Sequence, residues 1–312
     1  MVSARPRVAA IGDAIVDLVS PPMTPLPAGD VQTQVSGFTP LPGGNATNFA
    51  LAIAALGART SFAGAVGRDP YSDTIRDSFR RGGVRGILRV DSTRATGMTV
   101  ALTWRDGTRA LVTAPGANGS LRERDVPASF LTGSRHVHRA GYWWTSQLVG
   151  EPSARLLARA RRAGATTSLD ISTDPDGWPP KRVRAVQMCL PYVDTFFGNE
   201  VEIRAIGGGG PLASAARRIC AVGPSEVILH RGVLGSVRVA AHGSETAGAF
   251  RVRIDNPTGC GDVFNAGYVY ARLSGSPTQD ALRFANACAA LHLRDRRRPY
   301  PTRRDVERFL SR

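Results

Sequence analysis

Residues 256–267 read NPTGCGDVFNAG, with two glycines one residue apart and Asp262 directly behind them. Apolar residues after Asp262 recur at helical spacing, and the alternating stretch Val252-Arg253-Ile254 before the glycines suits a strand. The stretch is therefore predicted to be a strand-to-helix turn. Because the first N–H groups of a helix lack intrahelical partners, such a turn favours an anion.

The residue types in this turn suit phosphoryl transfer. Gly259 and Gly261 carry no Cβ, so a ligand can approach the backbone, and the N–H groups of Cys260, Gly261 and Asp262 face the same point. A carboxylate in the same turn can take a proton from a hydroxyl, which places a general base beside an anion cradle. The structural alternative is a tight turn in which Asp262 only caps a helix.

Strand and helix patterns alternate through most of the chain, which predicts an α/β fold with a doubly wound, mostly parallel sheet. No linker divides the chain, so residues 1–312 are predicted to form one domain. Two segments, about 14–42 and 91–118, depart from the alternation and are predicted to form a small β lid; they contain a short strand at Val31–Val35 and a hairpin turn at Asp106-Gly107. The strands and helices expected after residue 135 are 136–140, 166–170, 195–197 and 226–230, and 153–163, 180–190 and 211–221.

Composition and charge narrow the function. The net charge is +15, but the basic residues are almost all arginines spread along the chain, and the densest group, residues 294–298, contains an aspartate. Nucleic-acid binding would favour one concentrated basic face, so we expect no nucleic-acid partner. No apolar run is long enough to span a membrane, and no cleavage site follows the N-terminal apolar stretch, so we expect a cytoplasmic protein without a membrane partner.

A second glycine-rich stretch, residues 43–50 (GGNATNFA), opens an alanine-rich helix that ends at Gly57. Together, the two stretches resemble the N-terminal and C-terminal signatures of the ribokinase-like (PfkB) family of carbohydrate and nucleoside kinases. The resemblance extends from about residue 7 to Leu310. Further matches follow in order at Gly12 with Asp17, residues 64–69, Thr96-Gly97, residues 116–118, Asn199 with Glu202, and Gly232 with Gly235.

The resemblance implies a three-layer αβα fold with a small β lid, and roles for the matched residues. Asp262 is expected to be the catalytic base, and Gly259, Cys260 and Gly261 to hold the transition-state charge. The residues expected to bind the acceptor are Asp17, Gly43, Gly44 and Asn48. In isolation, Asp17 and Asn48 would be interpreted as a strand-end acid and a buried helix polar group.

The same resemblance implies ATP and Mg²⁺ as cofactors. Asn199 is expected near the nucleotide phosphates, and Glu202 to act on Mg²⁺ through water, since Mg²⁺ keeps much of its hydration. The remaining residues expected to bind nucleotide are His230, Gly232, Gly235 and Asn286.

Several positions depart from the family pattern. Asn256 stands where the second signature usually begins with Asp, and residues 294–298 lack the glycine of the family's monovalent-cation loop, so no K⁺ site is predicted. Ile15 and residues 141–144 (GYWW) replace residues that meet ribose in ribokinase, which argues against ribose as the acceptor. Tyr142, Trp143 and Trp144 either line the pocket, which would favour a nucleoside, or pack in the core.

The sequence thus predicts an ATP-dependent kinase that phosphorylates a hydroxymethyl group of a sugar or related polyol. A nucleoside kinase and a catalytically silent ligand-binding relative are the alternatives. The expected partner is a small sugar or nucleoside acceptor, and the resemblance leaves a homodimer through the lid open.

Overall fold

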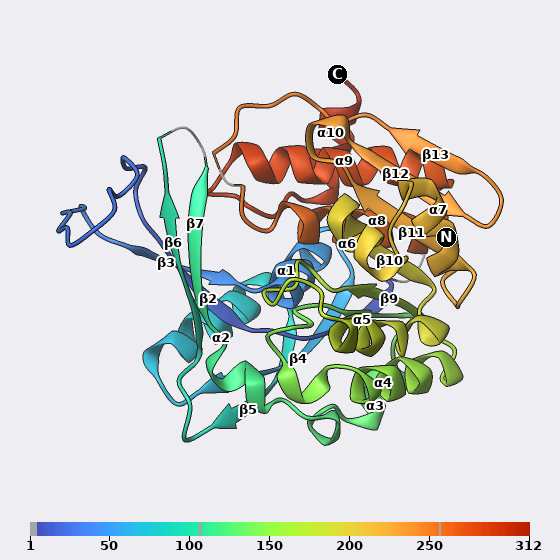
Figure 1. The fold of residues 1–312 in the computed structure, drawn as a ribbon, viewed down its shortest axis with the longest axis horizontal. Coiled ribbons are helices and arrows are strands. Elements are labelled where there is room, and N and C mark those ends of the chain that lie inside the picture. Colours follow the sequence, from blue (N-terminus) through green and yellow to red (C-terminus); the bar gives the residue numbers. More distant parts are fainter. Residues whose placement is uncertain (1–4, 106–107, 256) are drawn as a thin grey trace.

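The computed structural model describes residues 5–105, 108–255 and 257–312. Its largest element is a sheet with strand order β13-β12-β11-β10-β9-β8-β1-β4-β5, in which only β12 and β13 pair antiparallel to their neighbours. The fold is thus a mostly parallel α/β sheet, as predicted (Figure 1). Its strands are β1 (Arg7–Ile11), β4 (Arg59–Gly67), β5 (Arg85–Asp91), β8 (His136–Arg139), β9 (Thr166–Asp170), β10 (Thr195–Asn199), β11 (Glu226–His230), β12 (Ser236–Ala240) and β13 (Ser244–Ala247).

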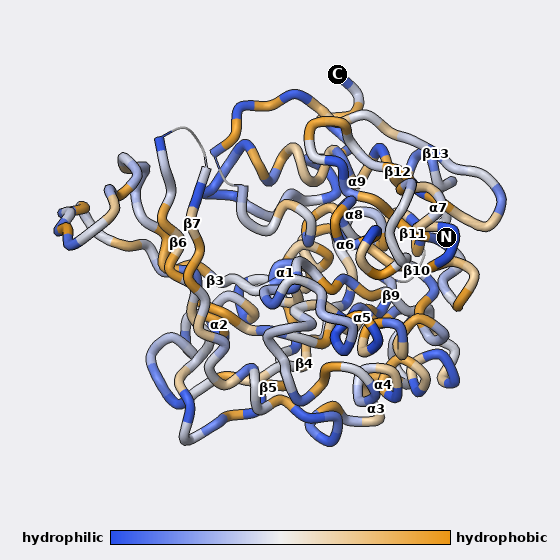
Figure 2. The backbone as a smooth tube through the Cα atoms, viewed as in Figure 1, coloured by the Kyte–Doolittle hydropathy of each residue, from blue (hydrophilic) through white to orange (hydrophobic). Residues whose placement is uncertain are grey.

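Helices cover both faces of this sheet because successive strand residues point to opposite faces and both sets are apolar. In β1, Val8 and Ala10 pack into one core, while Ala9 and Ile11 pack into another. Figure 2 shows the resulting apolar centre beneath more polar outer turns. The first core is covered by α1 (Asn45–Ala55), α2 (Pro70–Gly82), α8 (Cys260–Leu273), α9 (Thr278–Arg294) and α10 (Arg303–Leu310), and the other face by α3 (Ala128–Thr132), α4 (Glu151–Arg162), α5 (Pro180–Gln187), α6 (Glu200–Ile206) and α7 (Leu212–Cys220).

A second sheet stands apart from the first, at the left of Figure 1. Its strand order is β3-β2-β6-β7, with β2 (Ile15–Val19), β3 (Thr39–Gly43), β6 (Gly97–Thr103) and β7 (Arg109–Ala114). These strands come from the two segments that were predicted to leave the alternation. We call this four-stranded sheet the second sheet.

Two predicted strands are wrong. Residues 31–35 form no strand. The edge strand of the second sheet is instead Thr39–Gly43, whose register with β2 places Gly43 opposite Ile15. Residues 252–254 are irregular, because the chain there pairs with the end of a helix: the Asp255 N–H donates to the Leu293 carbonyl at 2.7 Å. The predicted turn at Asp106-Gly107 and the departure at Asn256 lie outside the described residues.

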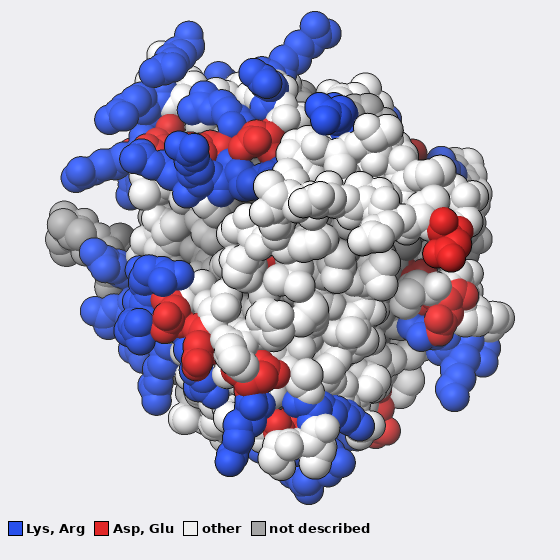
Figure 3. Space-filling view, turned by 90° about the vertical axis from the view of Figure 1, so that its left-hand side faces the viewer, with Lys and Arg blue, Asp and Glu red and all other residues white. Residues whose placement is uncertain are grey.

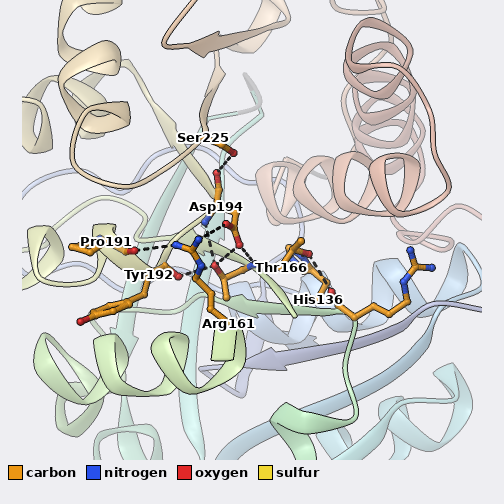
Figure 4. Close-up of polar contacts among 9 residues, drawn as sticks. His136, Arg161, Thr166, Pro191, Tyr192, Asp194 and Ser225 are labelled. Atoms are coloured by element: carbon orange, nitrogen blue, oxygen red, sulfur yellow. Dashed lines mark hydrogen bonds and ion pairs between the residues drawn. The ribbon is translucent and has the colours of Figure 1, made fainter. Parts of the chain in front are cut away.

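Partly exposed polar contacts join the amino ends of the central strands (Figure 4). The Asp194 carboxylate accepts the Thr167 N–H at 2.8 Å and lies 3.5 Å from the Arg161 guanidinium, while its backbone carbonyl accepts the Ser225 hydroxyl at 2.8 Å. Arg161 also donates to the Pro191 carbonyl at 3.0 Å. These contacts link α4, β9 and the segments before β10 and β11, which leaves the carboxyl ends of the same strands available for the site.

In the part of the chain that the structure describes, no helix combines the length and the apolar character needed to cross a membrane.

Gly12, directly after β1, lets α1 pack close to the sheet, because a Cβ there would lie 2.1 Å from the Ala140 carbonyl oxygen and 2.6 Å from the Ala46 Cβ. Gly12→Ala is expected to lower the free energy of unfolding by about 1–3 kcal/mol, as overpacking does in cores. Urea denaturation measures this. Gly248→Ala, whose Cβ would meet nothing within 4 Å, is the control. Equal stability of the two variants would contradict this account.

Candidate active site

The two glycine-rich stretches meet at one carboxylate. Asp262, in the first turn of α8, is 4% exposed. One of its oxygens accepts a hydrogen bond from the Asn45 amide at 3.1 Å, and the other accepts one from the Asn48 amide at 3.0 Å. Both asparagines lie in the first turn of α1, more than two hundred residues away in sequence. The structure therefore brings Asp262 and Asn48 together, and adds Asn45.

The anion cradle has the backbone that the two glycines permit. Gly259 precedes α8 with φ of 83°, a left-handed conformation that L-residues rarely adopt. A Cβ at Gly259 would also lie 2.8 Å from the Asn48 Nδ2, so the turn and α1 need this glycine to approach each other. Cys260, Gly261 and Asp262 then form the first turn of a 14-residue helix, where unpaired N–H groups favour negative charge.

Asp13, a residue that the sequence analysis did not single out, positions α1. It is fully buried, and its carboxylate accepts the backbone N–H groups of Asn45 at 3.1 Å and Ala46 at 2.9 Å. Gly44 allows this approach, since a Cβ there would lie 2.9 Å from the Asp13 carbonyl oxygen. Asp13 therefore fixes the helix end from which Asn45 and Asn48 reach Asp262.

Asp17, in β2, is 8% exposed and lies against Gly43, where a Cβ would come within 2.3 Å of its carboxylate. Burial, and secondarily repulsion from Asp13, raises the pKa of Asp17 to about 7, while Thr99 and the positive charge of Arg109 act against the rise. Arg109 lies at the start of β7. Burial raises the pKa of the Cys260 thiol in α8, and the positive charge of Arg109 acts against this rise. The second sheet thus brings Asp17 and Arg109 to the side of the cradle.

Asp170, which repels Asp262, also repels a further buried acid, Glu202. The Glu202 carboxylate accepts hydrogen bonds from the Asn199 amide at 2.7 Å and the Thr173 hydroxyl at 3.1 Å. Burial, followed by repulsion from Asp170, raises the pKa of Glu202 to about 7. The predicted pair of Asn199 and Glu202 is therefore in contact, within the capping box that starts α6.

Asp170 and His230 are joined through an asparagine that the sequence analysis did not assign. The fully buried Asn265 donates to Asp170 at 2.6 Å, and its oxygen lies 2.8 Å from the His230 Nε2. His230 lies beside the cradle, because a Cβ at Gly261 would be 3.6 Å from its ring. Burial lowers the pKa of His230, which favours a neutral imidazole that donates from Nε2 to Asn265.

The other residues predicted to bind nucleotide are Gly232, Gly235 and Asn286. Gly232 is exposed after β11, and a Cβ at Gly235 would lie 2.1 Å from the Ala247 carbonyl oxygen. Asn286, from α9, donates to the carbonyls of Ala247 and Gly248 at 3.1 Å each. Gly235 and Asn286 thus meet at the same backbone segment, where the Asn286 amide is already bonded to protein.

The aromatic residues after β8 belong to the core. Tyr142 is fully buried and donates to the Ala185 carbonyl at 2.8 Å, while Trp143 is 6% exposed and donates to the Ser172 carbonyl at 3.2 Å. Both pack in a cluster on the face covered by α4 to α7. Of the two interpretations, core packing is right for Tyr142 and Trp143, so these two residues no longer favour a nucleoside acceptor. Trp144 is only partly buried.

Among the described residues, no group of three or more His, Cys, Asp or Glu side chains has the arrangement of a metal site. Asp170 and Glu202 nevertheless fit a hydrated Mg²⁺. They are buried carboxylates that repel each other, and a cation binding through water relieves such repulsion without needing three protein ligands.

The residues that the sequence analysis missed are Asp13, Asn45, Arg109, Asp170, Asn265 and Tyr300. The Tyr300 hydroxyl donates to the Asn48 oxygen at 2.9 Å, which places it next to the Asp262 contacts. Two of these had a signal: Asn45 stands inside the first glycine-rich stretch, and Asp170 is the last residue of a parallel strand, at the edge of the sheet where ligands bind.

Comparison with known proteins agrees with this geometry. The model of the pfkB family of carbohydrate kinases matches residues 5–298. A ribokinase of Bacillus subtilis is 27% identical over 308 residues, covering 98% of this chain and 99% of its own, and a nucleoside kinase of Methanothermobacter thermautotrophicus is 29% identical, covering 86% and 84%. A solved structure of an E. coli protein assigned as a ribokinase II, in complex with ATP and Mg²⁺, superimposes with a TM-score of 0.86 at 21% identity, covering 98% and 99%.

The chain therefore belongs to the pfkB family of carbohydrate kinases and has the ribokinase-like fold. It is a phosphotransferase that acts on an alcohol group, and its relatives support phosphorylation of a sugar or nucleoside by ATP.

The contacts of Asp262 predict opposite effects of two substitutions. Burial and repulsion from Asp170 raise its pKa well above the ordinary value, while Asn48 and Asn45 act against the rise. Asn48→Ala removes a donor to the charged form and should raise the pKa further. Asp170→Asn removes a like charge and should lower it, each by about one pH unit or more.

Carbon-13 NMR of labelled aspartate carboxyls measures this pKa. Asp176→Asn, an exposed position outside the site, is the control and should leave the Asp262 signal unchanged. Shifts of the same sign in both site variants would contradict the arrangement.

Proposed function

We propose that this protein transfers the γ-phosphoryl group of ATP to a hydroxymethyl group of a sugar or related polyol, with Asp262 as the general base. The observation that carries the proposal is the meeting of Asp262 with Asn45 and Asn48 at the mouth of α8. One carboxylate, two amides and a helix N-terminus thus converge on a single point.

The environment of Asp262 strengthens it as a base. Burial, followed by repulsion from Asp170, raises the pKa of Asp262, and a carboxylate with a raised pKa accepts a proton more readily. In the proposed step, Asp262 takes the proton of the acceptor hydroxyl, whose oxygen bonds to the γ-phosphorus as the bond to the ADP oxygen breaks. An acceptor hydroxyl would take the place of one asparagine amide at the carboxylate.

The start of α8 would hold the moving charge. The N–H groups of Cys260, Gly261 and Asp262 are fixed by the helix before any ligand binds, so they need no reorganisation when charge develops. His230, neutral and held by Asn265, lies beside Gly261, where the nucleotide phosphates would pass.

Mg²⁺, held through water by Asp170 and Glu202, would screen the phosphate charges. Asn199, bonded to Glu202, would keep that carboxylate in place.

The acceptor would lie between Asp262 and the second sheet. Asp17 offers a buried carboxylate to its hydroxyls, and Gly43 and Gly44 leave room for Asp17 and Asp13. Asn48 is bonded to both Asp262 and Tyr300, so its part in acceptor binding would be shared with positioning the base.

A nucleoside acceptor is the second candidate, favoured by the 29% identity with a nucleoside kinase. A panel of sugars and nucleosides, assayed for ADP formation, tests both. Turnover of a sugar above any nucleoside supports the proposal, turnover of nucleosides alone favours the second candidate, and tight binding without any turnover indicates a silent ligand-binding protein.

Asp262→Asn should lower kcat by about 10²–10⁴, because the amide cannot accept the proton. The fold and the affinity for an ATP analogue should persist, as thermal unfolding and calorimetry would measure. Asp280→Asn, exposed in the first turn of α9, is the matched control. Unchanged turnover in Asp262→Asn would place the base elsewhere.

The second sheet is proposed to close over the bound acceptor. Hydrogen exchange of the β6 and β7 amides should slow when acceptor is added, because closure shields the strands from solvent. The amides of α4, on the far side of the large sheet, serve as the internal control. Equal exchange of β6 and β7 with and without acceptor would argue against a closing lid.

A further inference from the structure

A cavity of about 430 Å³ lies outside the site described above, between the end of α9, the segment that follows it and α10. Arg294, Arg298 and Arg308 line it, together with Tyr300. Figure 3 shows basic side chains gathered at the upper part of one face, at the level where α10 lies in Figure 1. The cavity contains part of the arginine-rich segment 294–298, to which the proposed function gives no role.

Among the described residues, the arginines of this cavity form no close ion pairs, although the charges of Arg308 and Arg298 add to the effect of the Thr302 hydrogen bonds, which lower the pKa of Asp305. Within the described ranges, none of Arg294, Arg298 and Arg308 has a carboxylate within 4.0 Å, in contrast to Arg303, which pairs with Glu307 on the same helix. The two lining carboxylates are engaged locally. Asp295 accepts the backbone N–H groups of Arg297 and Arg298, and Asp305 accepts the N–H and hydroxyl of Thr302.

This arrangement suits a phosphate group. Guanidinium groups donate in a planar fork that matches phosphate oxygens. The four arginines that line the cavity outnumber its two aspartates, so an anion would reduce the repulsion among the arginines. The volume is that of a site for a small metabolite rather than for a bare ion. Phe309, which lies under Arg294 with the guanidinium 5.7 Å from its ring, offers an apolar wall to the rest of such a molecule.

The wall of the cavity is linked to the catalytic carboxylate. The Tyr300 hydroxyl donates to the Asn48 oxygen at 2.9 Å, and the Asn48 amide donates to Asp262 at 3.0 Å. His292, just before the same segment, contacts the carbonyls of Pro299 and Thr258, and Thr258 directly precedes Gly259 of the anion cradle. A change in the position of residues 298–300 would therefore reach both the base and the cradle.

We propose that this cavity binds a small phosphorylated metabolite and that its occupancy is sensed at Asp262 through Tyr300 and Asn48. The binding proposal is argued from the residues that line the cavity, whereas any effect of the bound metabolite on catalysis rests on the proposed function. Binding and the Asp262 signal are therefore both measured without turnover.

Calorimetry with ribose 5-phosphate and with inorganic phosphate, in the presence of a saturating non-hydrolysable ATP analogue, tests the site. The double variant Arg298→Ala/Arg308→Ala should weaken ribose 5-phosphate binding about tenfold or more, because charged hydrogen bonds to the phosphate are lost. The matched control is Arg297→Ala/Arg304→Ala, which removes the same charge from the same two segments at exposed positions that do not line the cavity.

Equal weakening in both double variants would mean attraction by general charge and would overturn the site. Loss of ribose 5-phosphate binding when the ATP analogue saturates the nucleotide site would also overturn the proposed site. A DNA duplex that binds more tightly than ribose 5-phosphate, and that both double variants weaken equally, would overturn it as well.

The Asp262 carboxyl NMR signal tests the sensing. Saturation with ribose 5-phosphate should shift this signal in the unmodified chain but not in Tyr300→Phe, which keeps the cavity and loses the hydrogen bond to Asn48. Tyr300→Phe should bind ribose 5-phosphate within about twofold of the unmodified chain, since it removes no charged contact. An identical shift in both proteins, or no shift in either, would overturn the sensing and leave the binding result to be judged alone.

Discussion

The hydrogen bonds between the first turn of α1 and the Asp262 carboxylate are the contacts on which the site depends. They join two helix N-termini that the chain reaches more than two hundred residues apart, and a glycine at position 259 is required for them to meet. Asp13 holds the N-terminus of α1 in place, because its carboxylate accepts the first backbone N–H groups of that helix. A buried acid thus fixes the helix that in turn fixes the proposed base.

Burial of several acids around one point sets the electrostatics of the site. Asp13, Asp17, Asp262 and Glu202 all have pKa values raised primarily by desolvation, and neighbouring carboxylates add to the rise in the last three. Burying so much negative charge costs free energy unless cations or hydrogen-bond donors compensate. Asn45, Asn48, Asn199 and Asn265 supply donors, and the proposed Mg²⁺ and the Arg109 side chain would supply charge.

One departure from the expected structure lies in the segment that leads to this site. Residues 252–254 alternate like a strand but are irregular, and the chain is held at Asp255, which bonds to Leu293 at the end of α9 and accepts the backbone N–H of Arg296 at 2.8 Å. The segment after α9 is in turn joined to α1 through Tyr300. The proposed cradle, the proposed base and the arginine-lined cavity are consequently parts of one hydrogen-bonded region.

The sequence by itself determined the α/β class and the family, because strand and helix periodicities and the spacing of glycines are local properties of the chain. It also predicted the residues of the proposed cradle. It further singled out Asn199 and Glu202 as one motif, and the structure adds that the two side chains are hydrogen-bonded. Only the tertiary structure decided that Asn45 and Asn48 hold Asp262, that Asp170 and Asn265 lie beside His230, and that Tyr142 and Trp143 are core. The physical reason is that these contacts join residues from different strands and helices, whose neighbours are set by sheet order and packing rather than by any local pattern.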